Sequence, residues 1–183
     1  MIAYPTPLDG VFIVEPQIFG HNRGWFFESY SQPVLQSLRI DMRVVQANRS
    51  YSALKGTLRG LHCQKQPLPQ AKLVSCTRGA IADYAVDIRH GSPTYLKWFM
   101  AELTADNKKM LFVPKGFLHG FVTLTDDVEV EYKVDEIYRR ENDRSVLYSD
   151  PLFAIDWGVA SPVLSDKDRE APLFSQTDIY FEY

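Results

Sequence analysis

Cysteine is scarce in this sequence, with only Cys63 and Cys76 among 183 residues. Two cysteines that do not form a C-x-x-C pair cannot build a disulfide framework, so we expect reduced thiols in a reducing compartment. The first residues lack the positive start and the apolar run of a signal peptide, and no apolar stretch approaches membrane-spanning length. These absences predict a cytoplasmic protein that does not enter a membrane.

A large excess of charge of either sign is also missing. The formal net charge is −3 at pH 7, and the chain has no run of Lys or Arg and no heptad pattern. The charge therefore gives no general reason to bind nucleic acid. Any anionic ligand must instead be held by a few cations in particular places.

The common cofactor and metal motifs are absent or incomplete. No G-x-G-x-x-G joins a strand to a helix, and we expect Gly116 and Gly120 to lie in a loop between strands. The segment 114–119, which ends in His119, resembles half of a metal-binding barrel motif, but Gln64 stands where a second early histidine is needed. Two imidazoles are one ligand short of a catalytic zinc site. We predict no metal and no cofactor.

What the sequence does contain is a series of short β segments. Its length and its 45% hydrophobic content suffice for a single domain over residues 1–183. Over residues 82–88 apolar side chains alternate with Asp83 and Asp87, which predicts a strand covered on one face. Residues 33–38 form a short helix candidate. The pattern predicts an all-β, double-sheeted antiparallel barrel with a ligand cavity and short peripheral helices.

The most informative stretch is residues 56–74, GTLRGLHCQKQPLPQAKLV. It predicts a strand with Arg59 and His62, a proline-broken connection, and a second strand that begins at Lys72 and can point this lysine inward. A histidine in a cavity is suited to remove a proton near neutral pH, and a lysine is suited to stabilise an enolate oxygen. Because Gly60 is a candidate bulge, the sequence leaves open whether Arg59 and His62 share a face.

Two further residues each have a structural and a catalytic interpretation. Alternation over residues 128–134 places Tyr132 inside the sheet, either as a core tyrosine or as a neutral acid that returns a proton. Ser165-x-x-Asp168 resembles a helix capping box, but the carboxylate is equally able to orient a histidine. These residues alone do not separate the two interpretations.

The assembled motifs resemble one family over nearly the whole chain. The matching segments are FG and RG with FFES in 19–29, QAN at 46–48, LRGLH at 58–62, QAKLV at 70–74, VDIR and GSPT in 86–94, PKGFLHGF at 114–121, Tyr132-Lys133, IDW at 155–157 and LSDKDR at 164–169. In these segments the chain resembles the dTDP-4-dehydrorhamnose 3,5-epimerases of the RmlC type. The resemblance implies a cupin-like jelly roll that acts as a homodimer on a dTDP-sugar, without metal or redox cofactor.

The resemblance also implies roles for individual residues. It makes His62 the catalytic base, Asp168 its partner, Lys72 the enolate-stabilising cation and Tyr132 the proton donor. It places contacts to the sugar nucleotide on eight positions: Arg23, Glu28, Gln46, Asn48, Arg59, His119, Asp143 and Lys167.

The implied activity is that of an isomerase, which converts dTDP-4-dehydro-6-deoxy-D-glucose to dTDP-4-dehydro-L-rhamnose in deoxysugar biosynthesis. Related enzymes with the same catalytic set invert only C3 or only C5, so a single-site epimerase is an alternative. A non-catalytic barrel that binds a sugar nucleotide is a second alternative. Cys63 and Arg49 depart from the residues usual at these positions, as does the charged loop at 139–142.

Overall fold

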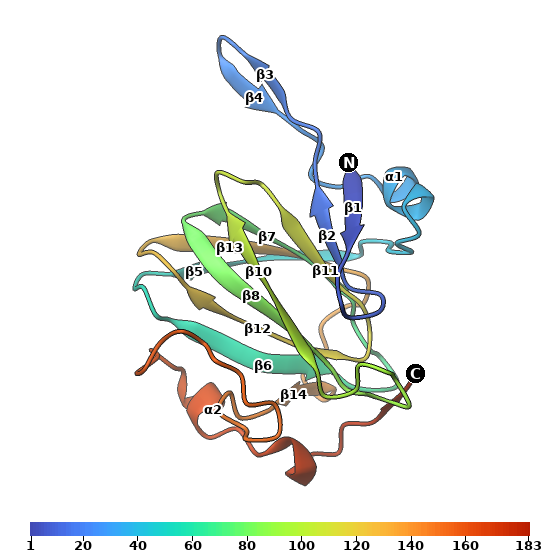
Figure 1. Ribbon diagram of the computed structural model, residues 1–183, viewed down its shortest axis with the longest axis vertical. Helices are drawn as coiled ribbons and strands as arrows, with labels where there is room; N and C mark the ends of the chain where they lie inside the picture. Colours follow the sequence, from blue (N-terminus) through green and yellow to red (C-terminus); the bar gives the residue numbers. More distant parts are fainter.

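Two antiparallel sheets pack face to face in the computed structural model, which describes residues 1–183 (Figure 1). The larger sheet contains, in spatial order, β1 (Ile2–Pro5), β2 (Phe12–Glu15), β11 (Met110–Val113), β7 (Lys72–Arg78), β13 (Val128–Val134) and β5 (Gln46–Ser52). The smaller sheet contains β10 (Trp98–Thr104), β8 (Ala80–Asp87), β12 (Phe117–Thr123), β6 (Leu58–Gln64) and β14 (Asp143–Ser145). This arrangement confirms the predicted all-β barrel.

The remaining elements are short and peripheral. They are the hairpin of β3 (Phe19–His21) and β4 (Gly24–Phe26), the parallel pair of β9 (Arg89–His90) and β15 (Phe181–Glu182), and the helices α1 (Gln32–Ser37), α2 (Asp166–Arg169) and η1 (Phe174–Gln176). The helix predicted at residues 33–38 is therefore confirmed as α1, which buries Leu35. No helix combines the length and the apolar character needed to cross a bilayer.

Apolar residues fill the space between the sheets and also the space below the smaller sheet. Between the sheets, Val74, Leu111 and Val130 of the larger sheet meet Phe121 of the smaller one. The opposite face of the smaller sheet is covered by the C-terminal segment, from which Trp157 and other apolar residues reach the sheet. The central strands β8 and β12 of the smaller sheet are thus buried on both faces.

Strand β8 is covered on both of its faces, so one expectation about it was wrong. The alternation of Asp83 and Asp87 with apolar residues predicted a strand with one open face, but both carboxylates are completely buried. Tyr84, Val86 and Ile88 pack against the C-terminal segment, and Asp83 points to the opposite side of the strand. The sequence of β8 alone does not reveal that cover, because the covering residues follow more than sixty positions later, roughly a third of the chain away.

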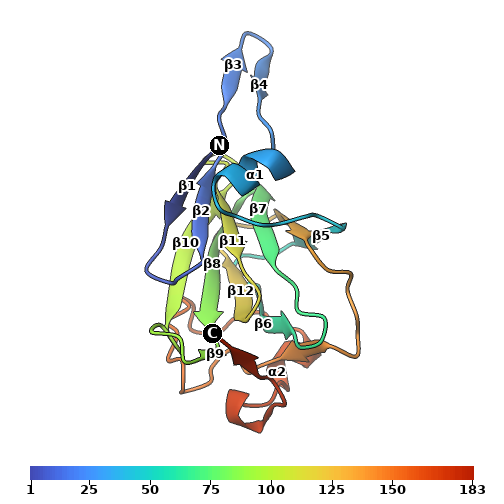
Figure 2. The ribbon, with the colours of Figure 1, turned by 90° about the vertical axis from the view of Figure 1, so that its right-hand side faces the viewer.

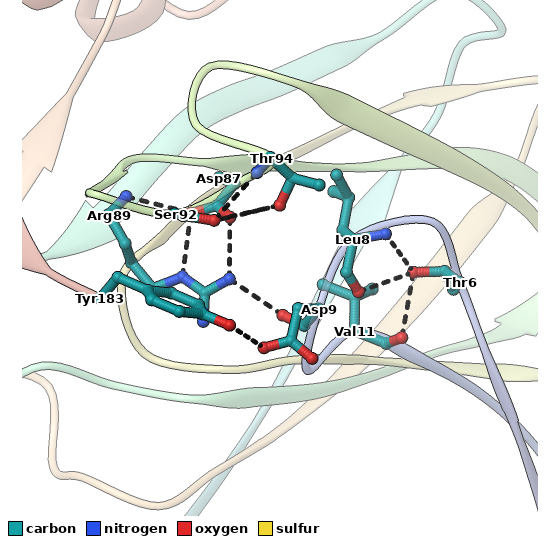
Figure 3. A network of polar contacts seen from close by, with 9 residues as sticks. All are labelled: Thr6, Leu8, Asp9, Val11, Asp87, Arg89, Ser92, Thr94 and Tyr183. Atoms are coloured by element: carbon teal, nitrogen blue, oxygen red, sulfur yellow. Dashed lines mark hydrogen bonds and ion pairs between the residues drawn. The ribbon is translucent and has the colours of Figure 1, made fainter.

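Asp87 is the centre of a polar network that joins the loop after β1 and the C-terminal Tyr183 (Figure 3). Its carboxylate accepts hydrogen bonds from three side chains, at distances between 2.5 and 2.9 Å: Arg89, Ser92 and Thr94. Burial raises the pKa of Asp87, but these hydrogen bonds outweigh burial and hold the pKa below its ordinary value. The same Arg89 donates to the backbone oxygen of Asp9, whose carboxylate accepts from the Tyr183 hydroxyl. The network therefore ties the N-terminal loop and the C-terminal residue to the barrel.

Candidate active site

Polar side chains from both sheets line two adjoining hollows at one side of the barrel, each about 300 Å³ in volume. The first hollow is lined by ten residues: Ser50, Arg59, His62, Lys72, His119, Phe121, Tyr132, Ser165, Lys167 and Asp168. The second shares four of its residues with the first, namely His62, Lys72, Tyr132 and Lys167. The four residues with predicted catalytic roles all line the first hollow: His62, Lys72, Tyr132 and Asp168.

A bulge in β6 brings Arg59 and His62 to the same face. Residues three apart in a regular strand point to opposite faces. Here His62 pairs with His119 and Arg59 pairs with Phe121, so three steps along β6 correspond to two steps along β12. The additional residue turns both side chains toward the cavity. This settles the question that the sequence left open.

Two glycines make this bulge possible, Gly60 in β6 and Gly120 in β12. A Cβ at Gly60 would lie 2.6 Å from Gly120 Cα and 2.9 Å from the His119 carbonyl oxygen, and the Gly60 φ is +133°. Gly120 thus lies within β12, and the expectation of a loop position for it was wrong. Its small size serves close contact between neighbouring strands. Gly116, in contrast, lies in the connection between β11 and β12, as expected.

His62 and Asp168 form a tight pair, with His62 Nε2 2.5 Å from Asp168 Oδ1. Asp168 is only 3% exposed. Burial raises the pKa of Asp168, but the hydrogen bond and charge of His62 and a hydrogen bond from Ser165 outweigh burial and lower it. An ionised carboxylate can only accept, so Nε2 carries the proton and Nδ1 is the imidazole nitrogen able to take another.

The helix α2 positions this carboxylate through its cap. Ser165 Oγ accepts from the backbone N–H of Asp168 and donates to Asp168 Oδ2 at 3.0 Å. The capping interaction and the contact with histidine were alternatives at the level of sequence, and Asp168 makes both. A helix of four residues has little stability of its own, so the cap and the contact with β6 hold it in place.

Lys72 and Tyr132 face the cavity from neighbouring strands of the larger sheet. The Lys72 ammonium group makes no hydrogen bond or ion pair within the protein, and burial lowers its pKa. Burial also raises the pKa of Tyr132 well above its ordinary value, so the phenol stays protonated at neutral pH. The predicted inward orientation of both side chains is confirmed. The tyrosine hydroxyl is 3.1 Å from Ser50 Oγ.

A second histidine and aspartate pair lies beside the first, and reasoning from the sequence missed its carboxylate. His119 Nε2 is 2.7 Å from Asp83 Oδ1, and both residues are buried. Burial raises the pKa of Asp83, while the charge of His119 opposes that rise. The other carboxylate oxygen has no hydrogen-bond partner. An aspartate in an otherwise apolar strand was the available signal for this position.

The predicted contacts to a sugar nucleotide separate into two groups. Six lie at or beside the cavity. Arg59 and His119 line the first hollow, Asn48 and Asp143 line the second, and Lys167 lines both. Gln46 lies beside the second hollow, where it forms a 2.7 Å hydrogen bond with Asn48. Arg23 and Glu28 line neither hollow. Reasoning from the sequence also missed Ser50 and Tyr138, which line the cavity.

Arg23 and Glu28 belong to an arm, which we define as residues 18–28. The arm projects beyond the barrel in Figure 1 and also, after a quarter turn, in Figure 2. Three of its aromatic side chains are at least half exposed: Phe19, Trp25 and Phe26. Within one chain, the arm presents apolar surface to solvent and its two predicted ligand contacts are remote from the cavity.

The donors at the cavity are not arranged for a metal ion. No group of three or more His, Cys, Asp and Glu side chains lies close enough to hold one. His62 and His119 are neighbours across β6 and β12, but each directs Nε2 toward its own carboxylate. The donor set therefore does not fit a catalytic zinc site.

This chain has a barrel of the cupin-like class, in which titratable side chains from both sheets surround one cavity. Residues 5–176 match the family model described as dTDP-4-dehydrorhamnose 3,5-epimerase. The chain belongs to this family.

Individual relatives agree over almost the full length. The dTDP-4-dehydrorhamnose 3,5-epimerase of Shigella flexneri is 44% identical over 181 residues, which cover 98% of this chain and 99% of that protein. A crystal structure of the Bacillus anthracis enzyme with TDP and PPi bound is 49% identical and has a TM-score of 0.92, covering 94% of this chain and 98% of its own. The Legionella pneumophila enzyme in complex with dTDP-4-keto-L-rhamnose is 43% identical, with a TM-score of 0.91 and coverage of 96% and 94%.

Proposed function

We propose that this protein inverts dTDP-4-dehydro-6-deoxy-D-glucose at C3 and C5 and so produces dTDP-4-dehydro-L-rhamnose. The observation that carries the proposal is the placement of His62, Lys72 and Tyr132 around one cavity. Two of them stand on the larger sheet and His62 stands on the smaller one, so a sugar between the sheets meets a base and an acid on different faces. The ligand of the Legionella pneumophila relative supports the choice of sugar.

The chemistry follows from the carbonyl group at C4 of the sugar. A ketone makes the hydrogens on C3 and C5 acidic, because the carbanion is delocalised onto oxygen as an enolate. His62 removes one of these protons, and the Lys72 ammonium stabilises the enolate oxygen. Tyr132 then donates its proton to the opposite face of the same carbon. The ionised Asp168 stabilises the imidazolium that forms on His62.

The cations at the cavity suit the diphosphate of such a substrate. Arg59 and Lys167 line the first hollow, and a guanidinium group can bind phosphate oxygens in a bidentate manner. Lys167 Nζ now lies 2.6 Å from Asp143 Oδ2 at the edge of the second hollow. We infer that the diphosphate lies near Arg59 and Lys167, and that the remaining predicted contacts, Asn48 and Gln46 among them, bind the rest of the nucleotide.

We also propose that two copies of the chain pair through the arm. Phe19, Trp25 and Phe26 remain at least half exposed within one chain, and burial of such groups is favourable by about 25 cal/mol per Å². Pairing gives Arg23 and Glu28 a route to the cavity of the second copy, which explains how residues remote from their own cavity contact a ligand.

The mass in solution tests this pairing. Sedimentation of the parent protein should give a dimer, and Trp25→Ser combined with Phe26→Ser should give a monomer. Leu152→Ser is the matched control, because Leu152 is also about half exposed but lies outside the arm. A monomeric parent, or an arm variant that remains dimeric, would contradict the proposal.

A specific comparison favours a second candidate, a single-site epimerase. A 3'-monoepimerase from Streptomyces bikiniensis, solved with dTDP-quinovose, is 32% identical with a TM-score of 0.89, covering 97% of this chain and 92% of its own. The fold is therefore compatible with inversion at one carbon.

Proton NMR of dTDP-4-dehydro-6-deoxy-D-glucose in deuterium oxide, with chelator-treated protein, separates the candidates. Deuterium at both C3 and C5 together with the L-sugar supports the proposal, and deuterium at one carbon supports the single-site enzyme. Ligand binding without any exchange would instead indicate a non-catalytic barrel.

A further inference from the structure

The hydroxyl of Tyr132 has one hydrogen-bond partner in the protein, Ser50 Oγ at 3.1 Å. Ser50 lines the first hollow and is partly exposed. It stands on β5, the outermost strand of the larger sheet, whose outer edge pairs with no other strand. Ser50 therefore contacts the hydroxyl of the partly buried Tyr132 from the edge strand of the sheet.

Each inversion leaves the two reacting residues in the wrong protonation state for the next one. His62 has gained a proton from carbon, and Tyr132 has lost one to carbon. No hydrogen bond joins Tyr132 to His62 or to Asp168, so the proton has no direct route between them. Burial opposes the charged form of Tyr132, which makes a tyrosinate unfavourable until a proton returns.

We infer that Ser50 returns the proton to Tyr132 after each inversion, an inference that rests on the proposed function. The Ser50 hydroxyl passes its proton to the tyrosinate oxygen and takes one from a water molecule at the cavity mouth in the same step. His62 releases its extra proton to water, so the hydroxide and the proton combine and no net charge remains. Ser50 acts through Tyr132 and is therefore a positioning residue that also relays a proton.

This relay matters more for an enzyme that inverts two centres than for one that inverts a single centre. The tyrosine must be reprotonated once between the two inversions of the same sugar molecule. If reprotonation is slow, the sugar leaves after one inversion, and the product mixture contains a singly inverted sugar. The ratio of singly to doubly inverted sugar thus measures the relay separately from the first chemical step.

The variants Ser50→Val and Ser50→Thr test the relay as a matched pair. The two side chains have nearly the same shape, and only threonine keeps a hydroxyl. Valine also fills the space in which a water molecule could replace the serine oxygen. Proton NMR of early product mixtures gives the ratio of the two sugars, and stopped-flow ultraviolet absorbance follows tyrosinate during turnover.

For Ser50→Val we expect about a tenfold lower rate of the second inversion, the loss typical of one missing hydrogen bond to a reacting group. Singly inverted sugar should accumulate, and the tyrosinate signal should persist longer than in the parent. Ser50→Thr should restore both measures. If Ser50→Val slows both inversions equally, without singly inverted sugar or persistent tyrosinate, then Ser50 only holds Tyr132 in place and the relay is refuted.

The parent protein in the same experiment separates this inference from the proposed function. A parent that inverts neither carbon refutes the proposed function itself. A parent that inverts both carbons, with Ser50→Val giving the parental ratio, refutes the relay alone.

Discussion

Replacement of Gly60 by alanine tests how the cavity is built. The new Cβ would lie 2.6 Å from Gly120 Cα and 2.9 Å from the His119 carbonyl oxygen. Both atoms belong to the backbone of the neighbouring strand, so no side chain can rotate away to relieve the contact. The Gly60 φ of +133° adds a conformation that residues with a Cβ rarely adopt.

Two costs therefore add in Gly60→Ala. Overpacking in a close-packed interior costs about 1–3 kcal/mol, and an unfavourable backbone conformation costs about 1–3 kcal/mol. Their sum, roughly 2–6 kcal/mol, is a large part of the 5–15 kcal/mol by which a typical domain is stable. If the strands separate instead, Arg59 and His62 move, and a displacement of about 1 Å can cost roughly a hundredfold in rate.

Equilibrium unfolding in urea, at one fixed protein concentration, measures the first effect. Gly158→Ala is the matched control, because Gly158 has a φ of +67° but its added Cβ would meet no atom within 4 Å. The control should lose about 1–2 kcal/mol, the cost of the backbone conformation alone. If Gly60→Ala lost no more free energy of unfolding than this control and kept full activity, the close approach of β6 and β12 would be refuted.

Three further outcomes follow from the same site. Tyr132→Phe should still exchange carbon-bound hydrogen with deuterium but should lose about 10²–10⁴ in net inversion, since general acid catalysis contributes that factor; inversion at the parental rate would make Tyr132 a core residue only. His62→Ala should remove nearly all deuterium exchange measured by NMR, and retained exchange would require a different base. Asp168 has a lowered pKa in the folded protein, so its ionised form contributes stability that is fully present above the unfolded pKa of about 3.9. This stability is lost as the pH falls from there through the lower pKa of the folded protein. The difference in unfolding free energy between the parent and Asp168→Asn should accordingly shrink below about pH 4, and a difference that stays constant to lower pH would contradict the assignment.

Local patterns were sufficient where a residue's environment depends on its own strand. The alternation over residues 128–134 predicted that Tyr132 faces inward, and Lys72 was placed inward by its spacing from Val74. In both cases the period of two fixes which side chains share a face once one face is buried. The capping pattern of Ser165 and Asp168 was likewise local and is present in α2.

Other features depended on parts of the chain that are distant in sequence. The C-terminal segment covers the apolar face of β8, so the face with Asp83 turns toward the larger sheet and is buried there. The pairing of His62 with Asp168 joins residues 106 positions apart. Neither the cover of β8 nor the pairing of His62 with Asp168 leaves a periodic signal in its own segment. Only the resemblance to a family pointed to the pairing.

The sequence by itself determined the fold class, the family and the residue types available for acid and base chemistry, because alternation and motif order are written along the chain. The tertiary structure decided which of these residues meet. The bulge at Gly60 depends on Gly120 in another strand, and it alone turns Arg59 and His62 to one face. The partner of Tyr132, Ser50, stands on β5, which is brought beside β13 only by strand pairing. A side chain's orientation can follow from its neighbours in sequence, but its hydrogen-bond partner depends on packing between strands that lie far apart in the chain.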